Sequence, residues 1–324
     1  MNINRIFLYP LFFCLVVFVA YFILPPSEQS FLLLGAMIAL VVYYGAIQIK
    51  YGIFALFVFV LTIQLYKMRD ELAFQQSQAE FYAKMKQVFS QFNSLESSPT
   101  VPIPKNIIQI WVQKDGGAPK IPKVHLNYIE QIKLMHPDYQ HLFFEEKDIV
   151  QFFQTNYPEY YTTYQRLPVF IQKLDFFRYL AIYHYGGFYF DVDIQPLRPL
   201  DDAIRNHQTV FPIDEYIPDC SPRFKPICDK DMHFLLGQYA FGAIPKHPFL
   251  KLLVDTIHHN LDLYINLHRK SGNTEIYVYR TTGPDFVSYV YANYVYKNQV
   301  YILENGKRQM FGNYARHDYY GSWK

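Results

Sequence analysis

The sequence predicts an α/β domain with a mostly parallel sheet, preceded by an apolar N-terminal region. Three observations support this prediction. The first 66 residues contain long uncharged apolar runs. From residue 103 onward, apolar runs of strand length alternate with longer segments whose apolar residues recur at helical spacing, which is typical of parallel sheets covered by helices. The 324 residues suffice for one enzyme domain plus accessory segments.

The composition argues against some classes of function. The net charge of +2 comes from basic residues scattered along the chain, so the sequence gives no case for nucleic-acid binding. Most of the 30 tyrosines and 29 phenylalanines are expected in the core. Three cysteines do not make a disulfide framework. Cys220 and Cys228 could pair only in an oxidising compartment, and we expect free thiols.

Residues 1–66 are predicted to anchor the protein in a membrane. The runs 6–24 and 31–49 are each long enough to cross a bilayer, and 51–66 is a shorter third candidate. With two crossings, Arg5 and the basic residues after the apolar region obey the positive-inside rule, which favours a cytoplasmic catalytic domain. Three crossings would place that domain in a lumen, such as that of the Golgi. The sequence has no Asn-x-Ser/Thr acceptor, which also favours the cytoplasm.

Residues 67–102 are predicted to form a stem helix and a linker. Apolar residues recur there with a four-three spacing that gives one narrow helical seam. The seam consists of Phe81, Met85, Val88, Phe92 and Leu95. We expect this helix to lie against the enzyme domain or against a partner, including a second copy of the chain. Three prolines mark residues 97–104 as the linker, and the enzyme domain is expected over 103–324.

The first half of the enzyme domain shows two strand–helix units. Residues 106–113 are expected to form a buried strand, and 122–135 a helix. Residues 139–144 are the next predicted strand, and 149–164 are predicted to be helical with a break at Pro158. This alternation predicts parallel neighbouring strands.

The segment 170–193 organises the domain. Apolar residues at helical spacing predict a helix over 170–185, which the glycine pair 186–187 ends. Residues 188–190 then form a buried strand that delivers Asp191 and Asp193 to its carboxyl end, where ligands bind in open α/β sheets. The two carboxylates share one strand face and suit a Mg²⁺ or Mn²⁺ ion that bridges a diphosphate.

The remainder of the domain completes the sheet and adds loops. The predicted elements are a short helix within 196–204, a strand at 210–212, a loop over the site at 214–231, a core segment at 235–244, and a helix from His247-Pro248 to about residue 267. Long loops such as 214–231 commonly form acceptor sites or lids. Thr282-Gly283-Pro284 predicts a tight turn that opens another helix, whose N-terminal N–H groups could meet an anion.

The central segment resembles the signature of the DXD sugar-binding glycosyltransferases, K-x-D-x-x-R-Y…G-G-x-Y-x-D-x-D, beginning here at Lys173. The resemblance implies a GT-A-like nucleotide-sugar-binding domain that uses Mn²⁺ or Mg²⁺. It also implies hexose transfer from a UDP-hexose or GDP-mannose donor, with retention of anomeric configuration. The family includes mannosyltransferases and enzymes of bacterial capsule synthesis. The predicted membrane region favours a membrane-borne glycan or a lipid-linked acceptor.

The resemblance implies roles for individual side chains. Asp193 is the expected metal ligand, and Asp191 is expected to accept hydrogen bonds from the ribose or the donor sugar. Asp175 and Arg178 share one helix face because they are three residues apart. Asp175 is then directed to sugar hydroxyls and Arg178 to diphosphate oxygens, which a guanidinium fork fits; the alternative is a surface ion pair between them. Trp111 is expected to stack on the nucleotide base or, alternatively, to fill the core.

The chain closes with His317 and then Gly321-Ser322-Trp323, a pattern similar to that at the end of family members. We expect this tail to fold over the diphosphate, because a tryptophan near a chain end needs a packing partner. His317 or Ser322 would add a metal or phosphate contact, and Trp323 would close the site. By the same resemblance, Gln238 stands near the donor sugar.

Three other functions fit parts of the sequence. A phosphate-transferring enzyme would use the same two aspartates. A glycosidase needs its carboxyl groups on opposite sides of the scissile bond, about 5–9 Å apart, whereas Asp191 and Asp193 share a strand face. A catalytically inactive membrane-bound sugar-nucleotide-binding or scaffold protein would keep the fold, but the intact aspartate pair and Arg178 argue against it.

Overall fold

The computed structural model describes residues 35, 56–65, 68–69, 80–87, 101–113, 120–271, 273–304 and 308–321. The chain divides into two units, Met1–Gln76 and Ser77–Lys324. In the first unit, residues 56–65 are helical. Among the described residues, no helix is both long and apolar enough to cross a membrane. The predicted spans 6–24 and 31–49 lie, apart from Gly35, outside the described residues.

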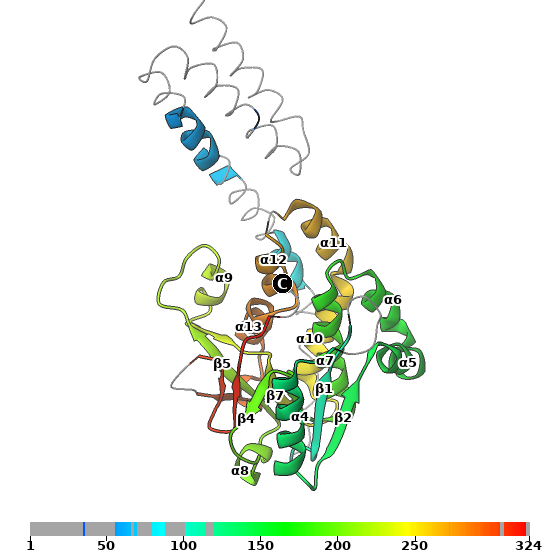
Figure 1. The fold of residues 1–324 in the computed structure, drawn as a ribbon. Helices are drawn as coiled ribbons and strands as arrows, with labels where there is room; N and C mark the ends of the chain where they lie inside the picture. Colours follow the sequence, from blue (N-terminus) through cyan, green and yellow to red (C-terminus); the bar gives the residue numbers. More distant parts are fainter. Residues whose placement is uncertain are drawn as a thin grey trace, which may run out of the picture. The chain divides into compact units, whose positions relative to one another are not determined.

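Within the described part of the second unit, a seven-stranded mixed sheet forms the centre (Figure 1). Its strand order is β2-β1-β3-β7-β5-β6, and β8 pairs with β5. The strands are β1 (Asn106–Ile110), β2 (Gln140–Phe144), β3 (Gly187–Phe190), β5 (Thr209–Tyr216), β6 (Phe234–Leu236), β7 (Ala240–Ala243) and β8 (Val300–Leu303). The predicted strands at 106–113, 139–144 and 188–190 are confirmed within a few residues.

The prediction of a mostly parallel sheet is wrong. β1 runs parallel to β2 and β3, and β5 runs parallel to β8. In contrast, β7 is antiparallel to both β3 and β5, and β6 is antiparallel to β5. The cause lies in the connections, because residues 217–239 contain only the four-residue helix α9 (Lys225–Cys228) and β6. A parallel neighbour requires a crossover connection, usually a helix that packs on the sheet, whereas a loop that only reverses the chain gives antiparallel strands.

A smaller sheet brings the end of the chain back to the central strand. Among the described residues it has the order β4-β10-β9. The strands are β4 (Ile194–Pro196), β9 (Met310–Phe311) and β10 (Ala315–His317). Since β4 begins one residue after Asp193, its pairing with β10 places His317 beside the aspartates.

The helices agree with the sequence pattern in most places (Figure 1). They are α4 (Lys123–Met135), α5 (Glu146–Asn156), α6 (Pro158–Arg166), α7 (Phe170–Tyr185), α8 (Asp202–Arg205), α10 (Pro248–His259), α11 (Leu261–Lys270), α12 (Thr274–Thr281) and α13 (Pro284–Asn293), in addition to α9. α7 has the predicted bounds, and Pro158 separates α5 from α6 as predicted. The helix predicted from His247 to about residue 267 is divided at Asn260, whose side chain donates to the carbonyl of Thr256.

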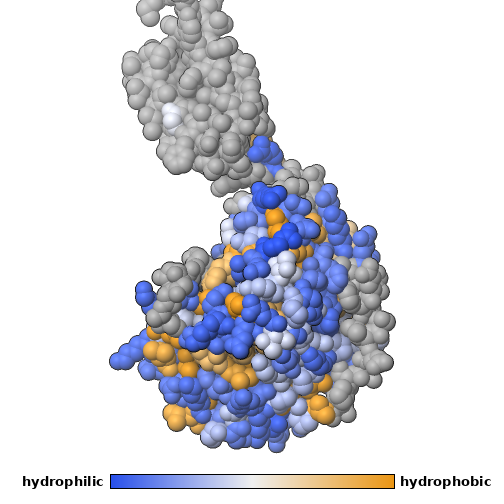
Figure 2. Space-filling model, turned by 90° about the vertical axis from the view of Figure 1, so that its right-hand side faces the viewer, coloured by the Kyte–Doolittle hydropathy of each residue, from blue (hydrophilic) through white to orange (hydrophobic). Residues whose placement is uncertain are grey.

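The two faces of the main sheet bury separate hydrophobic cores, because alternate strand residues point to opposite sides. One core contains Ile108 and Tyr189 and packs against α7, α10 and α13. The other contains Ile107 and Phe188 and packs against α4, α8 and the smaller sheet. β3 is buried throughout, which explains its unbroken aromatic sequence. The face in Figure 2 is mostly hydrophilic with separate hydrophobic patches, consistent with the expected burial of most aromatic residues.

Residues 80–87, the described part of the predicted stem from residue 70 onward, are helical and pack on α11 and α13. Phe81 and Met85 are fully buried. The ring centroid of Phe81 lies 5.3 Å from that of Tyr264, and the hydroxyl of Tyr289 donates to the carbonyl of Tyr82 at 3.3 Å. The described part of the seam is therefore covered by the chain's own domain, and it offers no free surface to a second copy.

Two expectations for the region after β5 are wrong. The predicted loop 214–231 begins later, because β5 continues through Asp214 to Tyr216. Free thiols were expected at Cys220 and Cys228, but the two residues form a disulfide. Helix α9 turns the chain back, so that their Cα atoms lie 6.0 Å apart, within the range that a disulfide requires.

His247 begins α10, which confirms the predicted structural role of the His247-Pro248 pair. Its Nδ1 accepts the backbone N–H of Phe249 at 3.2 Å, and its Nε2 is buried without a partner among the described residues. Burial lowers the pKa of His247 from 6.5 to about 3. The folded state therefore binds fewer protons than the unfolded state, and stability from this group falls as the pH drops below 6.5.

We predict that His247→Asn makes the protein less sensitive to acid. Asparagine keeps a capping acceptor but does not titrate. In the wild type, the single histidine should remove about 2 kcal/mol of unfolding free energy between pH 7 and pH 5, and the variant should lack this loss. Urea unfolding of both proteins at the two pH values measures the difference. An equal pH dependence in both would contradict the assignment.

Candidate active site

A glycine pair joins α7 to β3 and fixes where the strand begins. Gly186 and Gly187 have positive φ angles of 63° and 107°, a conformation that is costly for residues with a side chain. A Cβ atom on Gly187 would lie 2.5 Å from the carbonyl oxygen of Asn106. Both positions therefore favour glycine, so the chain can turn sharply and enter the sheet beside β1. Asp191 follows directly after the end of β3.

Asp191, Asp193 and His317 meet beyond the end of β3. The Nε2 atom of His317 lies 3.3 Å from Oδ1 of Asp193 and 3.9 Å from Oδ2 of Asp191. One potential ligand atom from each residue lies within 4.8 Å of the other two. The imidazole stacks on Tyr239, with 4.7 Å between ring centroids. Carboxylate oxygens are the ligands that Mg²⁺ and Mn²⁺ prefer, so this set fits the metal implied by the sequence.

The charge of Asp193 also suits a cation. Burial raises the pKa of Asp193, but hydrogen bonds from His317 and from the backbone N–H of Tyr320 hold it below its ordinary value. Burial lowers the pKa of His317, but the two aspartates raise it above its ordinary value. Burial raises the pKa of Asp191, and the Arg178 guanidinium partly offsets this effect. Asp193 is therefore ionised at neutral pH, as a carboxylate metal ligand must be.

Arg178 of α7 connects the helix to the strand end. Its guanidinium lies 3.2 Å from Asp175 and 3.4 Å from Asp191, and it sits 4.7 Å above the ring of Tyr189. The hydroxyl of Tyr189 also donates to Asp191. The ion pair between Asp175 and Arg178 exists, but it is not on the surface: the exposed fractions are 0% and 4%. Both residues line the same cavity as the aspartates.

Asp175 has further partners from distant parts of the chain. Thr282 Oγ1 donates to its carboxylate at 2.7 Å, and Gln238 Nε2 donates at 3.4 Å. Burial raises the pKa of Asp175 to about 6, although Arg178 opposes the shift. The sequence assigns Thr282 only to the turn before α13, which does begin at Pro284 as predicted. Its second role, holding Asp175, carries no local sequence signal.

These residues line a cavity of about 490 Å³, a size typical of small-molecule sites. Trp111, directly after β1, lines it together with Phe170 and Leu174. Trp111 is partly exposed, unlike a core tryptophan. The cavity therefore has an aromatic and aliphatic region on which a base can stack, and polar walls that include Asp191 and Asp193.

The described end of the chain lies over the metal-ligand set. The backbone N–H of Tyr320 donates to the Asp193 carboxylate at 2.8 Å, and the backbone N–H of Asp318 donates to the Asp193 carbonyl at 3.1 Å. Tyr320 also lines the cavity. Ser322 and Trp323 lie outside the described residues, so their predicted contacts stay predictions.

Sequence analysis missed the acidic residues of β5. Consecutive strand residues normally point to opposite faces, but Asp214 and Glu215 both line the cavity. The pairing register of β5 with β6 shifts between Ile213 and Glu215, and such irregularities re-aim side chains next to active sites. Burial raises the pKa of Asp214, and Arg308 opposes the shift. Arg308 itself pairs with Glu215 at 2.8 Å.

A sequence model of the glycosyltransferase sugar-binding region containing a DXD motif matches residues 122–211. The match runs from α4 into β5 and includes α7, the glycine pair, Asp191 and Asp193. Over this segment the chain is similar to the DXD-motif glycosyltransferases. His317 and Tyr320 complete the site from outside the DXD segment.

Characterised relatives are also similar to the chain. Inositol phosphoceramide mannosyltransferase 1 of Schizosaccharomyces pombe is 30% identical over 59% of this chain and 52% of its own length. Initiation-specific alpha-1,6-mannosyltransferase of Candida albicans is 35% identical over 34% of this chain and 29% of its own length. The chain thus spans about half or less of these relatives. A solved structure, PaToxG glycosyltransferase, matches 70% of this chain and 80% of its own at 15% identity with a TM-score of 0.39, which is too distant to support an argument.

Proposed function

We propose that the protein is a metal-dependent glycosyltransferase that moves a hexose from a nucleotide-diphosphate sugar to a glycan or glycolipid acceptor. One observation carries this proposal: Asp191, Asp193 and His317 converge in a cavity that also presents Trp111 and Arg178. The mixed α/β sheet with the DXD pair at a strand end supports a GT-A-like fold. The names of the similar proteins support mannose as the hexose.

Each residue of the site has a separate task in this proposal. Asp193 and His317 hold Mn²⁺ or Mg²⁺, which when bound supplies Lewis-acid stabilisation of the leaving diphosphate. Trp111 stacks on the nucleotide base. Asp191 and Asp175 accept hydrogen bonds from the ribose and the donor sugar. The buried guanidinium of Arg178 lies between the carboxylates of Asp175 and Asp191 and fixes their positions.

The tail and Arg178 complete the donor site. Arg178 directs its guanidinium toward the diphosphate while it balances the charge of its two carboxylate partners. Ser322 adds a metal or phosphate contact, and Trp323 closes the site over the donor. The hydrogen bond from the backbone N–H of Tyr320 to Asp193 supports this closure, because it holds Tyr320, two residues before Ser322, at the ligand set.

The reaction is proposed to retain anomeric configuration. The acceptor oxygen approaches the anomeric carbon on the face that the diphosphate leaves, and the leaving phosphate takes the acceptor proton. No covalent nucleophile is assigned. NMR spectroscopy of the product's anomeric centre tests this step, and an inverted product would overturn it.

Asp214 is proposed to bind the acceptor. Its carboxylate lines the cavity, and among the described residues no side chain hydrogen-bonds to it. We predict that Asp214→Asn slows transfer to the acceptor by about 10–100-fold, the value of one hydrogen bond to a charged group. Hydrolysis of the donor by water should stay near the wild-type rate. The exposed Asp219→Asn is the matched control, and equal loss of both reactions in Asp214→Asn would contradict the role.

The direct test is a screen of nucleotide sugars with the purified protein. UDP-hexoses and GDP-mannose are incubated with Mn²⁺, Mg²⁺ or a chelator, and the released nucleotide and the product mass are measured. We expect release from one donor, only with metal. Absence of metal-dependent release from every donor would favour the alternative function, a catalytically inactive membrane-bound sugar-nucleotide-binding or scaffold protein.

Residues 1–66 are proposed to anchor the enzyme in a membrane, with the catalytic domain in the cytoplasm and the Golgi lumen as the alternative. The uncharged apolar runs of the sequence support the anchor. A membrane position would bring the site close to a lipid-linked or membrane-borne glycan acceptor. Protease protection of the catalytic domain in sealed vesicles distinguishes the two orientations.

A further inference from the structure

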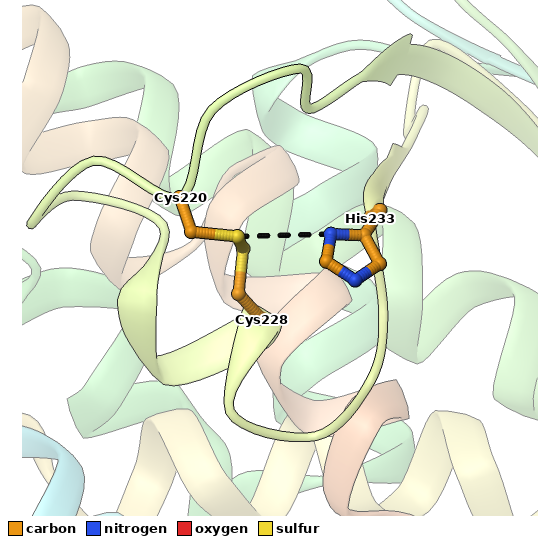
Figure 3. Close-up of side chains that lie close together, drawn as sticks. All are labelled: Cys220, Cys228 and His233. Atoms are coloured by element: carbon orange, nitrogen blue, oxygen red, sulfur yellow. Dashed lines mark hydrogen bonds between the residues drawn. A yellow bond between two sulfur atoms is a disulfide. The ribbon is translucent and has the colours of Figure 1, made fainter.

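A second candidate metal site lies on the loop between β5 and β6, apart from the DXD residues. Cys220 and Cys228 form the disulfide, and His233 turns its ring toward them from the other side of the loop (Figure 3). The distance from Cys220 Sγ to His233 Nδ1 is 3.6 Å. One ligand atom from each of the three residues lies within 4.8 Å of the others.

His233 lies between the disulfide and Asp231. Its Nδ1 faces Cys220 Sγ at 3.6 Å, while its Nε2 lies 3.9 Å from Asp231 Oδ1, beyond hydrogen-bond distance. Metal-bound histidines usually turn their second nitrogen to a carboxylate or carbonyl, which fixes the ring. Asp231 has a left-handed backbone with φ of 57°, which is tolerated by aspartate better than by most residues.

The spacing of the ligand atoms fits tetrahedral zinc. With Zn–S bonds of about 2.3 Å and Zn–N bonds of about 2.0–2.1 Å, a sulfur and a nitrogen on one zinc lie about 3.6 Å apart. The Cys220–His233 distance already has this value. Two sulfurs on one zinc lie about 3.8 Å apart, so only the disulfide must open. Cys220 and His233 are exposed and Cys228 is partly exposed, so a reductant and a metal ion can reach them.

We propose that the reduced loop binds one Zn²⁺ through Cys220, Cys228 and His233 Nδ1, with a water in the fourth position. A dithiol reductant supplies two electrons and two protons to the disulfide and becomes a disulfide itself. The two new thiols then release two protons as their thiolates bind zinc. Thiolate and imidazole ligands select zinc, whereas the carboxylates at the end of β3 suit harder ions. This inference does not depend on the proposed glycosyltransferase activity.

The site bears on the active-site cavity because the same loop carries Arg223. The Nε and Nη2 atoms of Arg223 donate to the buried carboxylate of Asp285 at 2.7 and 2.8 Å, and Arg223 lines the cavity. Cys220 and Cys228 stand on either side of it in the chain. The disulfide and the zinc site would each close the loop around Arg223, one in oxidising and the other in reducing surroundings.

Cobalt spectroscopy on the full-length protein tests the proposal. The protein is reduced with a phosphine, the phosphine is removed, and Co²⁺ is added without oxygen. We expect a sulfur-to-cobalt charge-transfer band with one equivalent of Co²⁺, which Zn²⁺ then abolishes. The unreduced protein should show no band. The DXD residues offer no sulfur, so the band distinguishes the loop from that site.

Single substitutions test whether Cys220, Cys228 and His233 are the metal ligands. Cys220→Ser and Cys228→Ser should lose the band, and His233→Ala should lose tight binding. Cys14→Ser and the neighbouring Asp229→Asn are controls that should bind as the wild type does. Circular dichroism checks that each variant is folded. Two results would overturn the proposal. One is that His233→Ala binds Co²⁺ as tightly as the wild type does, and the other is that the wild type shows no band although a thiol titration proves that its disulfide is reduced.

Discussion

Asp193→Ala is expected to lower kcat/KM for sugar transfer by about 1,000-fold or more, the largest effect of any single substitution. The carboxylate is ionised, lies 3.3 Å from His317 and is the central member of the proposed metal set. Without it the leaving diphosphate loses stabilisation of several kcal/mol, and each 1.4 kcal/mol is tenfold in rate. Nucleotide release over a Mn²⁺ titration measures both the rate and the metal affinity.

A second substitution separates metal binding from tail binding. Asp193→Asn keeps an oxygen that accepts the backbone N–H of Tyr320 but removes the negative charge. If the charge matters because it holds the metal, Asp193→Asn should lose nearly as much activity as Asp193→Ala. If Asp193 mainly holds the tail, the asparagine variant should stay active. Asp262→Ala is the matched control, because Asp262 is an exposed carboxylate with an exposed arginine partner.

The centre of this site could be predicted from the sequence because its determinants are local. The period of apolar residues gives α7, Gly186 and Gly187 give the turn, and the aromatic run gives β3. All of these lie within 24 residues, so Asp175, Arg178 and the two aspartates follow from one continuous segment. The resemblance to the DXD family added His317, which the smaller sheet brings within 3.3 Å of Asp193.

The remaining parts of the site depend on contacts between distant segments. Thr282 donates to Asp175 across a separation of 107 residues, and no local pattern records such a contact. Asp214 and Glu215 both reach the cavity because the pairing register of β5 shifts beside them. Strict alternation of side chains along the strand would turn one of the two away. The direction of β7 depends on the path of the chain between β5 and β6 rather than on its own residues. That segment reverses the chain without a crossover helix, which accounts for the difference between the predicted parallel sheet and the mixed sheet observed.

The disulfide between Cys220 and Cys228 likewise could not be predicted from a local sequence pattern. A separation of eight residues allows Cys220 and Cys228 to meet, but only if the chain reverses between them. α9 makes that reversal in four residues, too few for a helical period to be read from the sequence. Free thiols were expected because a disulfide persists only in an oxidising compartment. The structure shows that the two cysteines lie close enough to form the bond. The redox conditions around the protein therefore decide whether Cys220 and Cys228 form the disulfide or are thiols that, in our proposal, bind zinc.

Arg178→Met is expected to lower both stability and activity. The side chain keeps its length but loses its charge, which leaves the buried Asp175 and the partly buried Asp191 without their cation. Removing one partner from a buried ion pair costs about 3–5 kcal/mol. Because burial then raises the pKa of both carboxyls further, the folded state binds more protons than the unfolded state, and stability falls as pH rises. Urea unfolding should thus show a larger loss at pH 8 than at pH 5.

Arg178→Lys distinguishes charge from geometry in the same position. Lysine restores a cation and should recover part of the stability, but one ammonium cannot span Asp175, Asp191 and the carbonyl of Gln238 as the guanidinium does. Donor turnover should therefore stay about 100-fold below wild type if the fork positions the two carboxylates. Arg166→Met, in an exposed ion pair, should change stability by no more than about 1 kcal/mol. Near-normal turnover in Arg178→Lys would mean that charge alone suffices and that the fork has no positioning role.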